Sequence, residues 1–167
     1  DDHDHSGNLV PVLEACPQAT LVTTHFTVER TIRAMELPLP RMRWVNPGES
    51  FDAGDRTLVA TRPPIFDGPT TRGLFDTTSG VYWAVDTFAA LQTGHLEDAA
   101  DIPHELWEES LLQFGRMVSP WTAMLDDAKF QAAVDAVAAL GATTVAGGHT
   151  PALRGRRLTE AFELVRR

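Results

Sequence analysis

The sequence has 167 residues, of which 43% are hydrophobic and 22% charged, a composition typical of one globular domain with an apolar core. Fourteen basic residues stand against 23 acidic ones, and the formal charge of −9 argues against nucleic acid as a partner. The single Cys16 excludes an internal disulfide and a thiolate metal cluster built by this chain alone. No apolar stretch is long enough to span a membrane and the acidic N-terminus is unlike a signal peptide, so we expect a cytoplasmic protein.

The first half of the chain predicts short elements separated by prolines and turns. A short helix begins at Leu9, a β-branched strand follows at residues 20–23, and Thr24 caps a helix over residues 26–35. Turns are expected at residues 46–49 and 51–54. Three further strands are expected, at residues 43–45, 57–61 and 73–76.

The second half begins with a strand and continues as helices. Residues 81–85 form a nearly continuous apolar strand, which predicts burial on both faces. Residues 103–140 are helical with an interruption at Pro120, a last strand covers residues 143–146, and a helix at 158–165 closes the chain. No internal repeat or linker is present, so the expected fold class is a single α/β unit.

Six potential metal ligands stand at the N-terminus or directly after predicted strands or apolar segments: Asp2, Asp4, His5, Asp67, Asp86 and His149. Loops held by a sheet are where α/β folds place their chemistry. Four carboxylates and two imidazoles suit iron, manganese or zinc better than a soft metal. Because one metal does not need so many ligands, the set indicates two metals that share a bridging carboxylate.

Each of these side chains also has a purely structural interpretation. An Asp at the end of a strand commonly forms a turn, and His149 after two glycines could cap a helix. The N-terminal Asp and His residues could be solvated, tag-like sequence. The remaining histidines, His25, His95 and His104, are interpreted as surface or capping residues.

Taken in order, these residues resemble the metallo-β-lactamase fold and, within it, the diiron domain of flavodiiron proteins. That family carries the pattern His-x-Glu-x-Asp-His-x-Gly, followed by a His, an Asp and a final His. Residues 2–7 (Asp-His-Asp-His-Ser-Gly) are similar to the motif from its acidic ligand onward, and residues 64–69, 85–88 and 145–149 resemble the later segments. The intervals between successive candidate ligands from His5 to His149 are 62, 19 and 63 positions, close to those of the family.

The resemblance implies a metallo-β-lactamase-like αββα sandwich, of which this chain resembles the C-terminal two-thirds. The N-terminal β-rich part would come from upstream sequence or from another chain. Asp2 would bind the first metal, Asp4 and His5 the second, Asp86 would bridge the two, and His149 would complete the second site. Asp67 stands where the family has His, and Asp2 where it has Glu, which lowers the nitrogen content of the first site.

The function that the resemblance implies is a dinuclear non-haem metal domain that binds or reduces dioxygen or nitric oxide. Two metal ions are expected, iron first, with zinc or manganese as alternatives. The chain supplies no FMN site, so a separate flavoprotein would donate electrons. A homodimer is one of the oligomeric states that the sequence allows.

Three alternatives to this function are also open. The chain could be a zinc hydrolase of ester, thioester or lactam substrates, in which Asp4 is the catalytic residue that orients the nucleophile. It could be a diiron oxygen sensor that reports ligand binding to a partner. It could also be a scaffold without metal, given Asp67 in place of the family's His.

Overall fold

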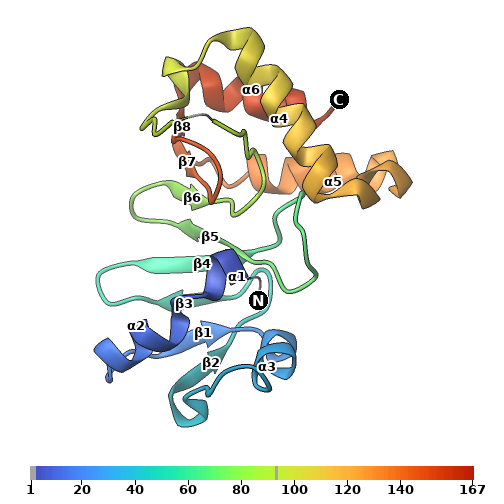
Figure 1. The fold of residues 1–167 in the computed structure, drawn as a ribbon. Coiled ribbons are helices and arrows are strands. Elements are labelled where there is room, and N and C mark those ends of the chain that lie inside the picture. The colour runs from blue at the N-terminus through green and yellow to red at the C-terminus, as the bar shows by residue number, and fades with distance from the viewer. Residues whose placement is uncertain (1–2, 93) are drawn as a thin grey trace.

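The computed structural model describes residues 3–92 and 94–167 (Figure 1). The described residues form eight strands: β1 (Leu21–Thr23), β2 (Met42–Trp44), β3 (Ser50–Asp52), β4 (Thr57–Thr61), β5 (Gly73–Asp76), β6 (Val81–Trp83), β7 (Thr144–Ala146) and β8 (Leu153–Arg154). They also form six α-helices: α1 (His3–Ser6), α2 (Leu9–Ala15), α3 (His25–Thr31), α4 (His104–Val118), α5 (Asp127–Ala138) and α6 (Gly155–Val165). Short 3₁₀-helices lie at Leu39–Arg41, Ala99–Asp101 and Pro120–Met124.

The strands form two sheets of unequal size. The larger sheet has the order β3-β4-β5-β6-β7-β8, and its neighbours are antiparallel except for the parallel pair β6–β7. A parallel pair needs a long crossover, which here contains α4 and α5. The smaller sheet is the parallel pair β1–β2. Figure 1 shows α4, α5 and α6 beside β6–β8, and the smaller sheet beside β3.

One face of the larger sheet is packed against the three long helices. Cross-strand partners on this face include Tyr82, Val145 and Leu153, which are fully buried. Trp107 of α4 and Val134 of α5, also fully buried, complete this core. Since side chains alternate between the two faces of a strand, the central residues Tyr82 of β6 and Val145 of β7 enter this core together.

The opposite face of the sheet is only partly covered. A small cluster of Val45, Phe51 and Ala60 joins the two sheets at the β3–β4 side. Farther along the same face, the side chain of Trp83 in β6 is 40% exposed. This face therefore offers apolar surface to solvent or to another segment.

Several predicted elements agree with the structure and others differ. The strands at residues 57–61 and 73–76 are confirmed with the predicted bounds. The strand predicted at residues 81–85 ends at Trp83, whose exposure shows that burial on both faces was wrong. Phe51, predicted in a turn, lies in β3 opposite Leu58, and the helix predicted to residue 35 ends at Thr31. None of the helices formed by residues 3–92 and 94–167 combines the length and apolarity needed to cross a membrane.

Candidate metal centre

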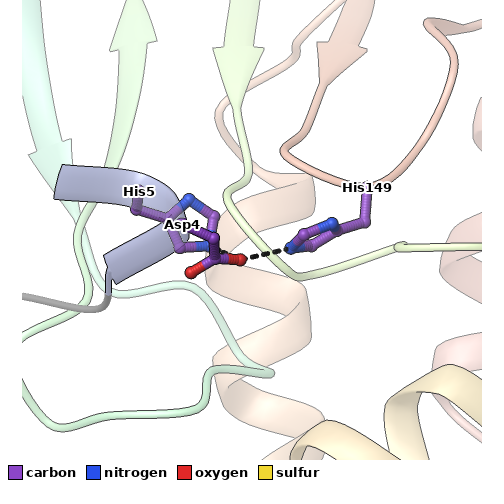
Figure 2. Close-up of side chains that lie close together, drawn as sticks. All are labelled: Asp4, His5 and His149. Atoms are coloured by element: carbon purple, nitrogen blue, oxygen red, sulfur yellow. Dashed lines mark ion pairs between the residues drawn. The ribbon is translucent and has the colours of Figure 1, made fainter. Parts of the chain in front are cut away.

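Three potential metal ligands from the two ends of the chain converge on one point (Figure 2). Asp4 and His5 lie in the single-turn helix α1, and His149 lies in the loop after β7. The Oδ2 atom of Asp4 is 3.3 Å from Nε2 of His149 and 3.6 Å from Nε2 of His5. One ligand atom from each residue lies within 4.8 Å of the other two. One carboxylate and two imidazoles at this spacing are a donor set for a divalent first-row metal.

Asp86 lies next to this group. Its Oδ1 atom is 3.2 Å from Nε2 of His5 and 3.6 Å from Nε2 of His149. The side chain is only 3% exposed, and its Oδ2 atom is buried without a hydrogen-bond partner in the described part of the chain. A buried carboxylate oxygen without a donor is destabilising, and a cation beside it would remove that penalty. The residues present therefore fit a metal site.

Backbone hydrogen bonds join the Asp86 segment to the His149 segment. They extend the parallel pairing of β6 and β7 beyond the strands and into the loops that carry the ligands. Three N–H groups donate across the two segments, at 2.7 to 3.0 Å: Ala84 to the carbonyl of Ala146, Gly148 to Val85, and Ala90 to His149. The two ligands thus sit on loops of fixed relative position, as a preorganised site requires.

The backbone on both sides of Asp86 is strained. Val85 has φ 56° and Phe88 has φ 68°, in the left-handed region that side chains other than glycine rarely adopt. For a β-branched residue such as Val85 this conformation is a genuine outlier. Strained residues of this kind cluster at functional sites because the surrounding structure holds them there.

Gly148 permits the close approach of the N-terminal helix. A Cβ atom at this position would lie 2.8 Å from Cε1 of His5, too close for a real contact. Next to it, the ring of His149 packs at 5.3 Å from that of Phe114 and at 5.4 Å, edge-on, from that of His5. A side chain at Gly148 would therefore displace a candidate ligand.

A buried threonine connects the loops that carry Asp67 and Asp86. The N–H of Ile65 donates to Oγ1 of Thr87 at 3.2 Å, and the Thr87 hydroxyl donates to the Ile65 carbonyl at 2.8 Å. Thr87 is fully buried, so these two hydrogen bonds fix the position of the Asp67 loop relative to the Asp86 loop.

Four of the six predicted ligands lie together in the structure. It brings Asp4, His5, Asp86 and His149 together, whereas Asp2 lies outside the described residues. Asp67 is not in the converging group, although it lines the same cavity as His5. Its Oδ1 accepts a hydrogen bond from the Thr71 hydroxyl at 3.0 Å, an interaction typical of a turn residue.

The sequence interpretation missed the residues that support the ligands. In the sequence the two glycines before His149 are only part of a ligand segment. The need for glycine follows from tertiary contacts, with His5 of α1 at Gly148 and with Thr150 and the Val85 carbonyl at Gly147. The strain at Val85 and the packing of Phe114 have no signal in the sequence, because both depend on tertiary contacts.

Comparisons with known proteins identify solved structures that have a similar fold. No protein-family model and no curated protein sequence matches this chain. Among solved structures, rubredoxin oxygen:oxidoreductase from Desulfovibrio gigas matches with a TM-score of 0.78 over 96% of this chain, at 18% identity. The flavodiiron protein from Giardia intestinalis matches with a TM-score of 0.69 over 88% of this chain, at 14% identity. The chemotaxis sensor ODP, as a peroxy diiron species, matches with a TM-score of 0.70 over 99%, at 16% identity.

The chain has the metallo-β-lactamase-like fold. It spans 40% of the Desulfovibrio protein, 35% of the Giardia protein and 67% of the ODP chain. The α/β class and the metallo-β-lactamase-like architecture expected from the sequence are confirmed. In this metallo-β-lactamase-like fold, the converging ligands lie in loops at the ends of β6 and β7 and in the N-terminal helix.

Proposed function

We propose that this chain forms the metal-binding part of a non-haem diiron domain that binds or reduces dioxygen or nitric oxide. The observation that carries the proposal is the convergence of Asp4, His5 and His149 beside the buried carboxylate of Asp86, whose Oδ2 atom has no hydrogen-bond partner in the described part of the chain. Proteins named as an oxygen:oxidoreductase, a flavodiiron protein and a diiron sensor share the fold, which supports this chemistry.

The ligands divide between two ions. Asp4, His5 and His149 would hold one ion, and Asp86 would bridge it to a second, for which Asp2 and Asp67 are the proposed ligands. A pair of ferrous ions supplies electrons and open coordination positions for a diatomic gas. The two carboxylates nearest the imidazoles, Asp4 and Asp86, would balance the charge of the bound cations.

Apolar residues lie next to the proposed metal ligands. The ring of Phe114, which is 5% exposed, packs against the ring of His149 at 5.3 Å, and Val85, which is 8% exposed, directly precedes Asp86 in the chain. A separate flavoprotein is the proposed electron donor.

We further propose that a β-rich segment packs on the open face of the larger sheet. The exposed ring of Trp83 and the partly covered apolar residues around it support this arrangement. Expression of the chain with and without the sequence that precedes it in its gene tests the idea. Higher solubility, a higher Tm and more bound metal in the longer protein are expected, and equal values for both would contradict it.

Anaerobic metal loading tests the main proposal. The full chain is loaded with ferrous iron or with zinc, its metal content is measured, and gas consumption is followed with an artificial reductant. Consumption of oxygen or nitric oxide by the iron form, lost in His149→Ala, is expected of a reductase. Gas binding without turnover would favour the sensor function, for which the likeness to ODP is a specific observation. Rapid ester or thioester hydrolysis by the zinc form, with no gas reaction of the iron form, would overturn the proposal.

A further inference from the structure

A groove of about 580 Å³ lies between α5 and the β4 side of the larger sheet. One wall is a stripe of α5, and the other is formed by β4 and the segment that follows it. The lining is mostly apolar and includes Val59, Pro63, Phe66, Trp121, Ala133 and Val137. A groove of this size and apolar character is typical of a site for a small organic molecule.

The groove lies on the face of the sheet that the long helices cover. Val59 of β4 is opposite Phe75 of β5, which in turn is opposite Tyr82 of β6. Since Tyr82 belongs to the core beneath the helices, Val59 shares the helix-covered face. The β-rich segment proposed above packs on the opposite face, around Trp83, and would not fill this groove.

The charged side chains of the groove are all basic. They are Arg62 and Lys129, and no carboxylate lines the groove among the described residues. The chain as a whole carries a formal charge of −9, and Lys129 is its only lysine. In the cavity beside the metal centre, by contrast, Arg72 shares the wall with Asp67. The groove therefore favours an anion, although the protein as a whole is acidic.

The two basic residues lie towards one end of the groove. The indole N–H of Trp121, just before α5, donates to the carbonyl of Phe66, just after β4, at 3.1 Å. Lys129 lies in the first turn of α5, and Arg62 directly follows β4. Farther along α5 the wall is apolar and includes the buried Val137. The groove thus has a cationic end and an apolar body.

This division of charge matches a molecule with an anionic head and one apolar chain. From Lys129 to Val137 the helix rises over eight positions, which is about 12 Å. An extended chain advances about 1.2 Å per bond, so an acyl chain of roughly ten carbons has that length. Each buried methylene group tightens binding about fourfold, so the apolar body would contribute most of the affinity.

We propose that the groove between α5 and β4 is a binding site for a medium-chain fatty acid, whose carboxylate is attracted by Arg62 and Lys129. The site goes beyond the proposed diiron chemistry, because none of the converging metal ligands lines the groove. A bound acyl chain would fill the space between the helices and β4.

Calorimetry with a series of fatty acids tests the proposal on the full chain, below the concentrations at which the acids form micelles. The Kd is expected to fall about fifteenfold from octanoate to decanoate, which adds two methylene groups. The further fall to dodecanoate should be smaller, because that chain is longer than the groove. Decyltrimethylammonium, which carries the opposite charge, is expected to bind more weakly than decanoate, although a protein of charge −9 attracts cations in general.

Variants of the two basic residues test the recognition of the head. Arg62→Gln and Lys129→Gln should each raise the Kd for decanoate about two- to fivefold, the range expected for ion pairs exposed to solvent. Arg33→Gln, which changes an exposed arginine outside the groove, is the matched control and should leave the Kd unchanged.

Variants of α5 test the position of the acyl chain. Ala133→Leu places a larger side chain in the wall and should raise the Kd about tenfold or more, because it displaces about two methylene groups of the ligand. Ala132→Leu, at the exposed neighbouring position outside the groove, should leave the Kd unchanged. The zinc-loaded and the metal-free chain should bind decanoate equally, which separates this site from the metal centre.

Four results would overturn the proposal. They are equal Kd values in Ala133→Leu and Ala132→Leu, tighter binding of the cationic amphiphile, a Kd that changes with zinc loading, and a dimer in solution that Ala133→Leu dissociates. The last result would assign the groove to a second copy of the chain. Because the metal-free chain is also measured, failure here leaves the outcome of the iron experiments unaffected.

Discussion

The Nε2 atom of His5 lies 3.2 Å from Oδ1 of Asp86, which joins the N-terminal helix to the loop after β6. The second oxygen of the same carboxylate is buried and accepts no hydrogen bond in the described part of the chain. One oxygen therefore faces the converging imidazoles, and the other is available to a different cation. This division is what a carboxylate that bridges two metals needs.

Substitution of Asp86 tests the bridging role. Asp86→Asn keeps the size of the side chain and removes its charge, so we expect the metal content to fall from two ions to one or none. Elemental analysis of anaerobically prepared protein measures this. Asp101→Asn, at an exposed position of the 3₁₀-helix at Ala99–Asp101, serves as the control and should retain both ions. Full retention of two ions in Asp86→Asn contradicts the bridging role.

Asp67→His tests whether position 67 serves the first metal site. The cavity wall contains both Asp67 and His5, so an imidazole here would add a nitrogen ligand, and we expect tighter iron binding in a competition titration. Thr71→Val is the matched variant, because it removes only the hydroxyl that donates to Asp67. It should lower the Tm slightly and leave iron affinity unchanged. If Asp67→His binds iron no better than the parent chain, Asp67 is a turn residue.

Much of the fold and most of the converging group could be predicted from the sequence. Residues 57–61 are β-branched or apolar throughout, and Leu74 and Phe75 stand between Gly73 and Asp76. Both patterns predict strands, and the structure has both with the predicted bounds. Asp86 directly follows the strand predicted at residues 81–85, and His149 follows the strand predicted at residues 143–146 through two glycines, so their position at one edge of a sheet follows from the local pattern. The spacing of the segments then indicated the fold.

The remaining features depend on contacts that no local pattern contains. Val85 is apolar and β-branched, so the pattern extends the strand to it, whereas the Gly148 N–H donates to its carbonyl and the chain turns there with positive φ. The strand β8, with only Leu153–Arg154, is too short to give a period. The orientation of Asp67 toward Thr71 depends on a side-chain bond within a turn, which competes with metal binding at the same carboxylate.

Thr87→Val should destabilise the protein by about 2–4 kcal/mol, because it leaves the N–H and the carbonyl of Ile65 buried without partners. Chemical denaturation measures the free energy of unfolding. Thr150→Val is the matched control, since the Thr150 hydroxyl is buried and has no partner in the described part of the chain. It should be neutral or stabilising. Equal losses in the two variants would show that the bonds to Ile65 contribute nothing.

Asp76 makes stability depend on pH in the acidic range. The Ser79 hydroxyl, which donates to Oδ2 at 2.6 Å, lowers the pKa of Asp76, and the N–H groups of Thr78 and Ser79 act in the same direction. A lowered pKa in the folded state gives stability that is present above the unfolded pKa of about 4 and is lost as the pH falls through the folded value. The gap in Tm between the parent chain and Asp76→Asn should therefore shrink below about pH 4. A gap that is constant down to the acid limit contradicts this assignment.

Val85 offers a test of the backbone strain beside the candidate bridging ligand. Val85→Ala and Val85→Gly both remove the buried side chain, but only glycine adopts a φ of 56° without steric conflict. We therefore expect Val85→Gly to be more stable than Val85→Ala by about 1 kcal/mol. At an ordinary site the order is reversed, and Ala132→Gly on the exposed face of α5 should cost about 1 kcal/mol. Denaturation curves of the three variants measure both differences. If Val85→Gly is less stable than Val85→Ala, the result contradicts the left-handed conformation of Val85 and the geometry of the Asp86 loop that depends on it.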